Sequence, residues 1–141
     1  MPRNRQSRWR ESVELQIPFH DLDPLEICWH GHYVRYFEIA RTALLRSIDY
    51  DYPEMRASGY AWPVIELHVR YAQPLRYRQR IGVEAFIAEW ENRLKIEYVI
   101  RDFESGMRLT RGYTIQVAVD MRTGEMRLLS PDVLAEKLGV K

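Results

Sequence analysis

A short stretch near the N-terminus holds the side chains best suited to chemistry. Asp21 and Asp23 precede Pro24. A few residues later, His30 and Gly31 open a segment with a helical pattern. A helix N-terminus presents backbone N–H groups without intrahelical partners, together with a partial positive charge. A carboxylate beside such an end can attack a carbonyl carbon, or direct water at it, while the N–H groups hold the carbonyl oxygen. These residues favour acyl transfer without serine, cysteine or metal.

The elements that must position these residues are a strand before them and a helix after them. Residues 12–19 alternate apolar and polar side chains, which predicts a first strand. Between residues 32 and 48, apolar side chains recur at steps of three and four, which predicts one amphipathic helix. Residues 49–59 read as a short irregular or helical link.

Strand patterns dominate the rest of the chain. Alternating side chains bounded by turn residues predict strands over residues 63–71, 81–89, 93–102, 107–120 and 125–129, and a short helix is expected over 131–138. One long helix cannot cover both faces of such an antiparallel sheet. We therefore predict an α+β fold whose exposed sheet face invites a partner subunit.

Composition narrows the function classes. The chain has 141 residues, 46% of them hydrophobic, and a net charge of +1, so we expect one soluble domain over 12–141 and no general attraction to nucleic acid or membrane. Residues 1–11 read as a flexible N-terminal tail. Cys28 is the single cysteine, which excludes an intrachain disulfide and fits a reducing compartment. No apolar run approaches the ~20 residues of a membrane span. We expect a cytoplasmic protein.

Three segments together carry a family resemblance: Asp21-Leu22-Asp23-Pro24, Trp29-His30-Gly31-His32-Tyr33 and Glu38-Ile39-Ala40-Arg41. Their motifs and spacing resemble the hotdog-fold thioesterases of the 4-hydroxybenzoyl-CoA type. That family has a D-x-D-P-like motif after the first strand and an E-x-A-R-like motif in the central helix. The resemblance covers the whole domain and implies a hotdog fold, with one long central helix wrapped by an antiparallel sheet of five to six strands.

The resemblance also implies roles. Asp23 would be the catalytic carboxylate, and the backbone N–H groups at His30 and Gly31 would hold the thioester oxygen. The substrate would be an acyl thioester of coenzyme A or of acyl carrier protein, and no cofactor or metal would be needed. The family joins two sheets edge to edge and builds each site at that seam, which implies a homodimer or homotetramer in which Asp23 faces the partner.

The residues expected to bind substrate are Leu25, Glu26, Trp29, Tyr33, Glu66, Arg78, Arg80 and Arg93. Leu25 and Glu26 stand where the family usually has glycine, so their side chains should reshape the acyl pocket. Glu66 lies on a strand expected near the seam. The arginines, together with Arg76, cluster at strand ends and could bind the phosphates on the pantetheine side.

Other interpretations stay open. Asp23 could cap a turn before Pro24, and Asp21 could be structural. Asp21, Asp23, His30 and His32 suggest a metal site, but no second pair of ligands appears downstream. The chain has no G-x-S-x-G, P-loop or G-x-G-x-x-G motif. The alternative functions are a non-catalytic acyl-binding hotdog domain and a hotdog dehydratase, whose loop context His30 and His32 fit poorly.

Overall fold

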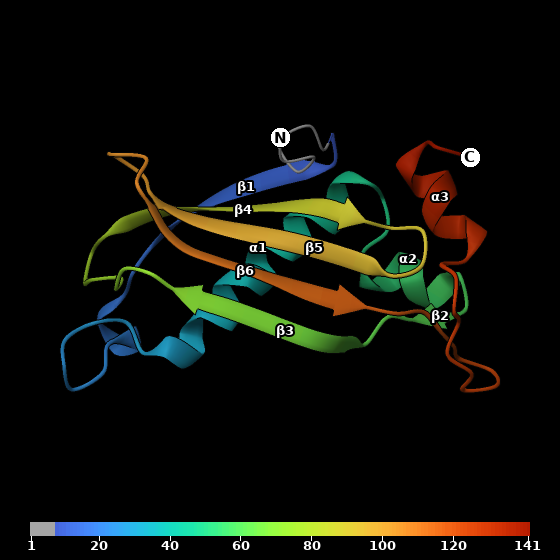
Figure 1. The fold of residues 1–141 in the computed structure, drawn as a ribbon, viewed down its shortest axis with the longest axis horizontal. Helices are drawn as coiled ribbons and strands as arrows, with labels where there is room; N and C mark the ends of the chain where they lie inside the picture. The colour runs from blue at the N-terminus through green and yellow to red at the C-terminus, as the bar shows by residue number, and fades with distance from the viewer. Residues whose placement is uncertain (1–7) are drawn as a thin grey trace.

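A helix of 15 residues, α1 (Tyr33–Ser47), lies across one face of a five-stranded antiparallel sheet (Figure 1). The computed structural model describes residues 8–141. The strand order in the sheet is β1-β4-β5-β6-β3. These strands are β1 (Arg10–Gln16), β3 (Val64–Tyr71), β4 (Arg80–Glu89), β5 (Leu94–Asp102) and β6 (Arg108–Gln116). The predicted α+β architecture, one long helix on an antiparallel sheet, is confirmed.

Smaller elements close the two ends of this arrangement. The 3₁₀ turns η2 (Phe19–Asp21) and η3 (His30–His32) precede α1, and η3 runs directly into it. At the other end lie α2 (Tyr52–Ala57), the two-stranded ribbon of β2 (Tyr60–Ala61) with β7 (Val119–Asp120), and α3 (Asp132–Leu138). No helix among residues 8–141 is long and apolar enough to cross a bilayer.

The longer elements agree with the sequence patterns. The helix expected over 32–48 is α1, and β3, β4 and β5 match their predicted strands within one residue. The first strand differs, because β1 spans Arg10–Gln16 and the chain turns into η2 after Pro18. Of the tail expected over 1–11, residues 1–7 lie outside the described residues, while residues 10 and 11 belong to β1.

The last two predicted strands are wrong in part. The segment expected over 107–120 is interrupted after β6, because the chain leaves the sheet and β7 pairs with β2 instead. Residues 125–129 form only an isolated bridge, Val119 with Met126. Leu128 and Leu129 are 83% and 64% exposed, so the apolar side chains of this segment have no sheet face to cover.

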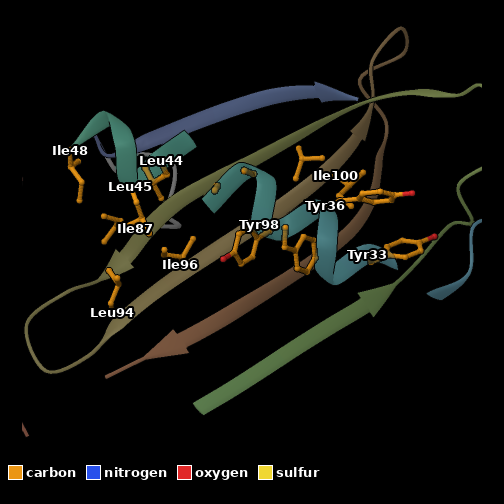
Figure 2. Packing of buried hydrophobic residues seen from close by; sticks show 14 of the residues in the cluster. Tyr33, Tyr36, Leu44, Leu45, Ile48, Ile87, Leu94, Ile96, Tyr98 and Ile100 are labelled. Carbon is orange, nitrogen blue, oxygen red and sulfur yellow. The ribbon is translucent and has the colours of Figure 1, made fainter. Parts of the chain in front are cut away.

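The core lies between α1 and the face of the sheet that the helix packs against, as Figure 2 illustrates. Phe37 of α1 stacks on Tyr98 of β5, with ring centroids 4.4 Å apart. Beside this pair, a β-carbon at Gly112 would lie 2.5 Å from the carbonyl oxygen of His68 and 2.6 Å from the Phe37 ring. Only glycine permits this approach, so position 112 sets the spacing of helix and sheet.

The edge strand β3 is uncovered. It pairs with β6 on one side only, and Ile65, Leu67 and Tyr71 are 56%, 45% and 46% exposed. Leu67 and Tyr71 stand opposite Thr114 and Thr110, which are buried. Directly opposed residues in an antiparallel pair share a face. These apolar side chains therefore lie on the same face of the sheet as α1 but extend beyond what α1 covers.

Candidate active site

A small hairpin-like loop carries the predicted catalytic aspartate. Leu22 and Cys28 form a bridge, and the Asp23 N–H donates to the carbonyl oxygen of Ile27 at 2.8 Å. The Asp23 carbonyl oxygen accepts from the Glu26 N–H at 2.9 Å, which closes the turn. The Asp23 carboxylate itself accepts one hydrogen bond, from the Leu25 N–H to Oδ1 at 2.8 Å. Its orientation is thus fixed through one oxygen.

A cavity of about 310 Å³ joins this loop to the start of the long helix. Its lining residues are Asp23, Ile27, Cys28, His30, Tyr33, Tyr71, Ala72, Gln73 and Pro74. Asp23 and His30 come together here, although seven positions separate them in sequence. Among the described residues, no hydrogen-bond acceptor is bound to the backbone N–H of His30 or Gly31. Asp23 and two unpaired N–H donors thus lie at the same end of α1.

Aromatic side chains hold the helix opening in place. The Tyr71 hydroxyl, at the end of β3, donates to the His30 carbonyl oxygen at 2.8 Å. The Tyr71 ring packs edge-on against Tyr33, with centroids 4.7 Å apart. Tyr33 is buried, and that burial raises the pKa of its hydroxyl to about 12. Gly31 lies under the Trp29 ring, where a β-carbon would collide with it.

Asp21 occupies a different environment from Asp23. It is 1% exposed, and its Oδ2 accepts hydrogen bonds from the Tyr36 hydroxyl at 2.5 Å and from Arg35 Nη2 at 2.8 Å. Burial would raise the pKa of the Asp21 carboxyl, but the bonds from Tyr36 and Arg35 and the charge of Arg35 outweigh it and lower that pKa. Asp21 is thus an anchored anion that does not line the cavity.

The other predicted substrate-binding residues lie elsewhere. Leu25 is 78% exposed, Glu26 has a left-handed φ of 65°, and neither lines the Asp23 cavity. Trp29 is 47% exposed beside Gly31.

The predicted phosphate-binding arginines and Glu66 do not line this cavity either. Arg80 donates to Glu14 at 2.7 Å and Arg93 to Glu89 at 3.2 Å. Glu66 accepts from the Tyr113 hydroxyl at 3.0 Å, and Arg78 has a left-handed φ of 66°. None of them is among the residues that line the cavity. The structure does not bring these four side chains to Asp23.

A second, larger cavity of about 590 Å³, missed by sequence reasoning, lies where α1 meets α2 and β2. Its lining residues include Glu38, Arg41, Thr42, Leu45, Met55, Trp62, Pro63 and Gln116. The Trp62 indole N–H donates to the Tyr50 hydroxyl at 3.0 Å, and the Trp62 carbonyl oxygen accepts from Gln116 Nε2 at 2.8 Å. These bonds hold Trp62 in place as part of the cavity lining. The only sequence signal was the family motif that contains Glu38 and Arg41.

The four candidate metal ligands, Asp21, Asp23, His30 and His32, do not surround a common point. Asp21 is bound by Tyr36 and Arg35, whereas Asp23 and His30 line the smaller cavity. Within residues 8–141, no group of three or more His, Cys, Asp and Glu side chains is arranged to hold a metal ion.

Comparisons with known proteins agree on one family. The profile of the family described as the thioesterase-like superfamily matches residues 17–138. The chain is 30% identical over 132 residues to a Synechocystis protein, sll0410, provisionally named an esterase, an alignment that covers 93% of this chain and 79% of that protein. It is 28% identical over 77 residues to YneP of Bacillus subtilis, provisionally named an acyl-CoA thioesterase, covering 55% of this chain and 56% of that one.

The fold is that of solved thioesterases. The structure is similar to the DHNA-CoA thioesterase of Staphylococcus aureus, with a TM-score of 0.75 and 25% sequence identity over 84% of this chain and 80% of that one. It is also similar to a 1,4-dihydroxy-2-naphthoyl-CoA thioesterase of Synechocystis, with a TM-score of 0.78 and 18% identity over 92% and 96% of the two chains. The predicted hotdog fold is confirmed.

Proposed function

Because the chain belongs to the thioesterase-like superfamily, we propose that it is an enzyme that hydrolyses acyl thioesters of coenzyme A or of acyl carrier protein. One observation carries the proposal: Asp23 shares a cavity with the start of α1, where the N–H groups of His30 and Gly31 have no acceptor among the described residues. The three matching motifs support the 4-hydroxybenzoyl-CoA type within the superfamily.

In the proposed mechanism, the thioester carbonyl enters the cavity with its oxygen toward the N–H groups of His30 and Gly31. Asp23 attacks the carbonyl carbon and forms a mixed anhydride while the C–S bond breaks, and water then hydrolyses the anhydride to the free acid and restores the Asp23 carboxylate. Alternatively, Asp23 removes a proton from a water molecule that attacks the same carbon while the C–S bond breaks. The Leu25 N–H holds Oδ1 of Asp23 and leaves Oδ2 for the reaction. The developing oxyanion receives two backbone hydrogen bonds. The thiolate is a good leaving group and departs without an acid.

We also propose that the active form is a homodimer joined through β3. Two such strands can pair antiparallel across their free edges, with Leu67 and Ile65 covered in the process. A two-fold axis at His68 would set Glu66 opposite Arg70 of the second copy. Arg70 has no ion-pair partner among the described residues, so this register gives it one on each side of the axis.

This pairing would complete the site. Tyr71, at one end of β3, borders the Asp23 cavity, and Pro63, just before its other end, borders the larger cavity. Antiparallel pairing sets opposite ends of the two strands side by side. The larger cavity of one copy would then adjoin Asp23 of the other, and we propose that it takes the acyl group.

The test is a panel of acyl-CoA and acyl-carrier-protein thioesters of increasing acyl size, with thiol release measured at micromolar protein. We expect turnover on at least one class, in a form that sediments as a dimer or larger. Tight acyl-CoA binding without thiol release would instead support the non-catalytic acyl-binding domain. Water loss from a 3-hydroxyacyl substrate with the thioester intact would support the dehydratase.

A further inference from the structure

We propose that Asp21 is a positioning residue for the reaction, because it joins the loop that carries Asp23 to the first turns of α1. This inference rests on the proposed function, since it takes Asp23 as the reacting group. Asp21 does not line the cavity, so it would act through the residues that it holds.

The side chain of Asp21 fixes the loop to the helix. Its two closest donors, Arg35 and Tyr36, are successive residues of α1. The Tyr36 ring is buried, and its hydroxyl also lies 3.4 Å from the sulfur of Cys28, which belongs to the far side of the same loop. A single hydroxyl thus contacts both sides of the loop, at Asp21 and at Cys28.

The main chain of Asp21 fixes the helix opening. Its carbonyl oxygen accepts from the Trp29 N–H at 2.9 Å, and Trp29 directly precedes His30. Asp21 is therefore the residue at which three connections meet: to α1 through the carboxylate, to the helix opening through the carbonyl, and to Asp23 two positions along the chain. An error of about 1 Å in such an arrangement can lower a rate by ~10²-fold.

The physical chemistry favours a positioning role over simple packing. A buried carboxylate is unfavourable unless charged and hydrogen-bonded partners satisfy it. Asp21 has both kinds of partner, and charge-assisted bonds of this type are short and directional. His20 and His32 each place a ring nitrogen 3.8 Å from Oδ1 of Asp21. These contacts fix the orientation of the Asp21 side chain as well as its burial. An apolar side chain at position 21 could be buried but would have no such fixed orientation.

The decisive variant is Tyr36→Phe, which keeps the ring and removes the hydroxyl bound to Asp21. The matched control is Tyr98→Phe, because Tyr98 is equally buried and its hydroxyl contacts Thr114 at 2.8 Å, away from the loop. We expect Tyr36→Phe to lower kcat about tenfold with little change in KM. Tyr98→Phe should alter only thermal stability.

A second measurement does not depend on any substrate. Hydrogen exchange of the Asp23 and Trp29 amides, whose bonds define the loop, should accelerate about tenfold in Tyr36→Phe but not in Tyr98→Phe. If Tyr36→Phe fails to fold, Arg35→Met serves instead, because the Arg35 side chain is 50% exposed and its loss removes one bond to Asp21.

Equal kcat and equal loop exchange in Tyr36→Phe and Tyr98→Phe would overturn the positioning role. That failure differs from failure of the proposed function. If the wild-type protein releases no thiol from any thioester, the function is wrong, and loop exchange still decides whether Asp21 holds the loop. If the wild type turns over and Asp23→Asn does not, while Tyr36→Phe behaves like its control, only the positioning role is lost.

Discussion

The two cavities along α1, one at its start and one beside its middle and C-terminal part, are built from different parts of the chain. The smaller one, with Asp23, is formed by a short loop and the backbone of a helix opening, and its geometry depends on main-chain hydrogen bonds. The larger one is formed by side chains of α1 and α2 around Trp62, whose bonds to Tyr50 and Gln116 fix its wall. The smaller cavity contains the candidate reactive groups, and the larger cavity provides more volume.

This difference indicates how catalysis and acyl-group selection would be divided between the two subunits of the proposed homodimer. Chemistry needs donors and a carboxylate held to fractions of an ångström, which backbone bonds supply. Selection of an acyl group needs a shaped apolar space, which packed side chains supply. The smaller cavity borders Tyr71 at one end of β3, and the larger cavity borders Pro63 just before its other end. Figure 1 shows the free edge of this strand. An antiparallel dimer through β3 would therefore bring the larger cavity of one copy to Asp23 of the other.

The largest effect on activity should come from Asp23→Asn, which removes the negative charge of the side chain and preserves its shape. We expect kcat to fall by at least ~10²-fold with an unchanged circular dichroism spectrum. Asp120→Asn is the matched control, because Asp120 Oδ1 accepts from the N–H two residues ahead at 2.8 Å, as Asp23 Oδ1 does. Near-normal turnover in a folded Asp23→Asn protein would defeat the assignment of chemistry to the smaller cavity.

The next largest effect is expected at the proposed dimer interface through β3, which would bring the two cavities together. Arg70→Glu should weaken the dimer about 30- to 1,000-fold, because two attractive pairs become two repulsive pairs, and four contributions of about 0.5–1 kcal/mol sum to about 2–4 kcal/mol. Sedimentation over a range of protein concentrations measures this. The double variant Glu66→Arg with Arg70→Glu should restore the dimer, and a double variant as weak as the single one would exclude the register centred on His68.

A smaller effect is expected in the larger cavity. Thr42→Leu adds apolar bulk to the part of α1 that lines it. The ratio of kcat/KM for long over short acyl groups should fall about tenfold, within the 1–3 kcal/mol usual for pocket methylenes. Thiol release from two substrates of different length gives the ratio. An unchanged ratio would mean that the acyl group lies elsewhere.

A change in stability alone is expected at Glu26. Its φ of 65° lies in the left-handed region, which is unfavourable for a residue with a side chain. Glu26→Gly should raise the free energy of unfolding by about 0.5–1 kcal/mol, after the greater unfolded-state entropy of glycine is subtracted. Thermal melting measures the gain. A lower melting temperature would show that the glutamate side chain stabilises the loop by contacts beyond those described.

The smallest effect should be that of a chelator. Backbone N–H groups, and not an ion, would stabilise the oxyanion, so EDTA should leave thiol release unchanged. Loss of activity that returns on adding zinc or another divalent ion would restore the metal interpretation of the Asp and His residues.

Sequence periodicity predicted the long elements because their side chains face one continuous core. The helix α1 and strands β4 and β5 each present a regular apolar face to it, whereas β3 keeps the alternating pattern but packs only Val69 against the core. The same reasoning failed after β6, where short segments pack through irregular contacts and periodicity carries no information. The predicted first strand also ended at residue 19, three residues beyond the end of β1 at Gln16, because Pro18 follows and η2 begins.

The candidate site was predictable only in part. The proximity of Asp23 and His30 follows from a short loop before a helix. The partners of Asp21 are 14 and 15 positions away on the helix face, and no local pattern identifies them. The larger cavity depends on α2 and on the pairing of β2 with β7. Two-residue strands of this kind leave no alternation to detect.

The close contact at Gly112 also limits how this protein could be re-engineered. With Phe37 and the His68 carbonyl oxygen against it, the distance between helix and sheet is a fixed dimension at mid-molecule. Directed evolution toward bulkier substrates cannot widen the protein there without separating its layers. Adaptive substitutions should therefore accumulate among the residues that line the two cavities, and libraries that randomise Phe37 and Gly112 should yield mostly unfolded variants.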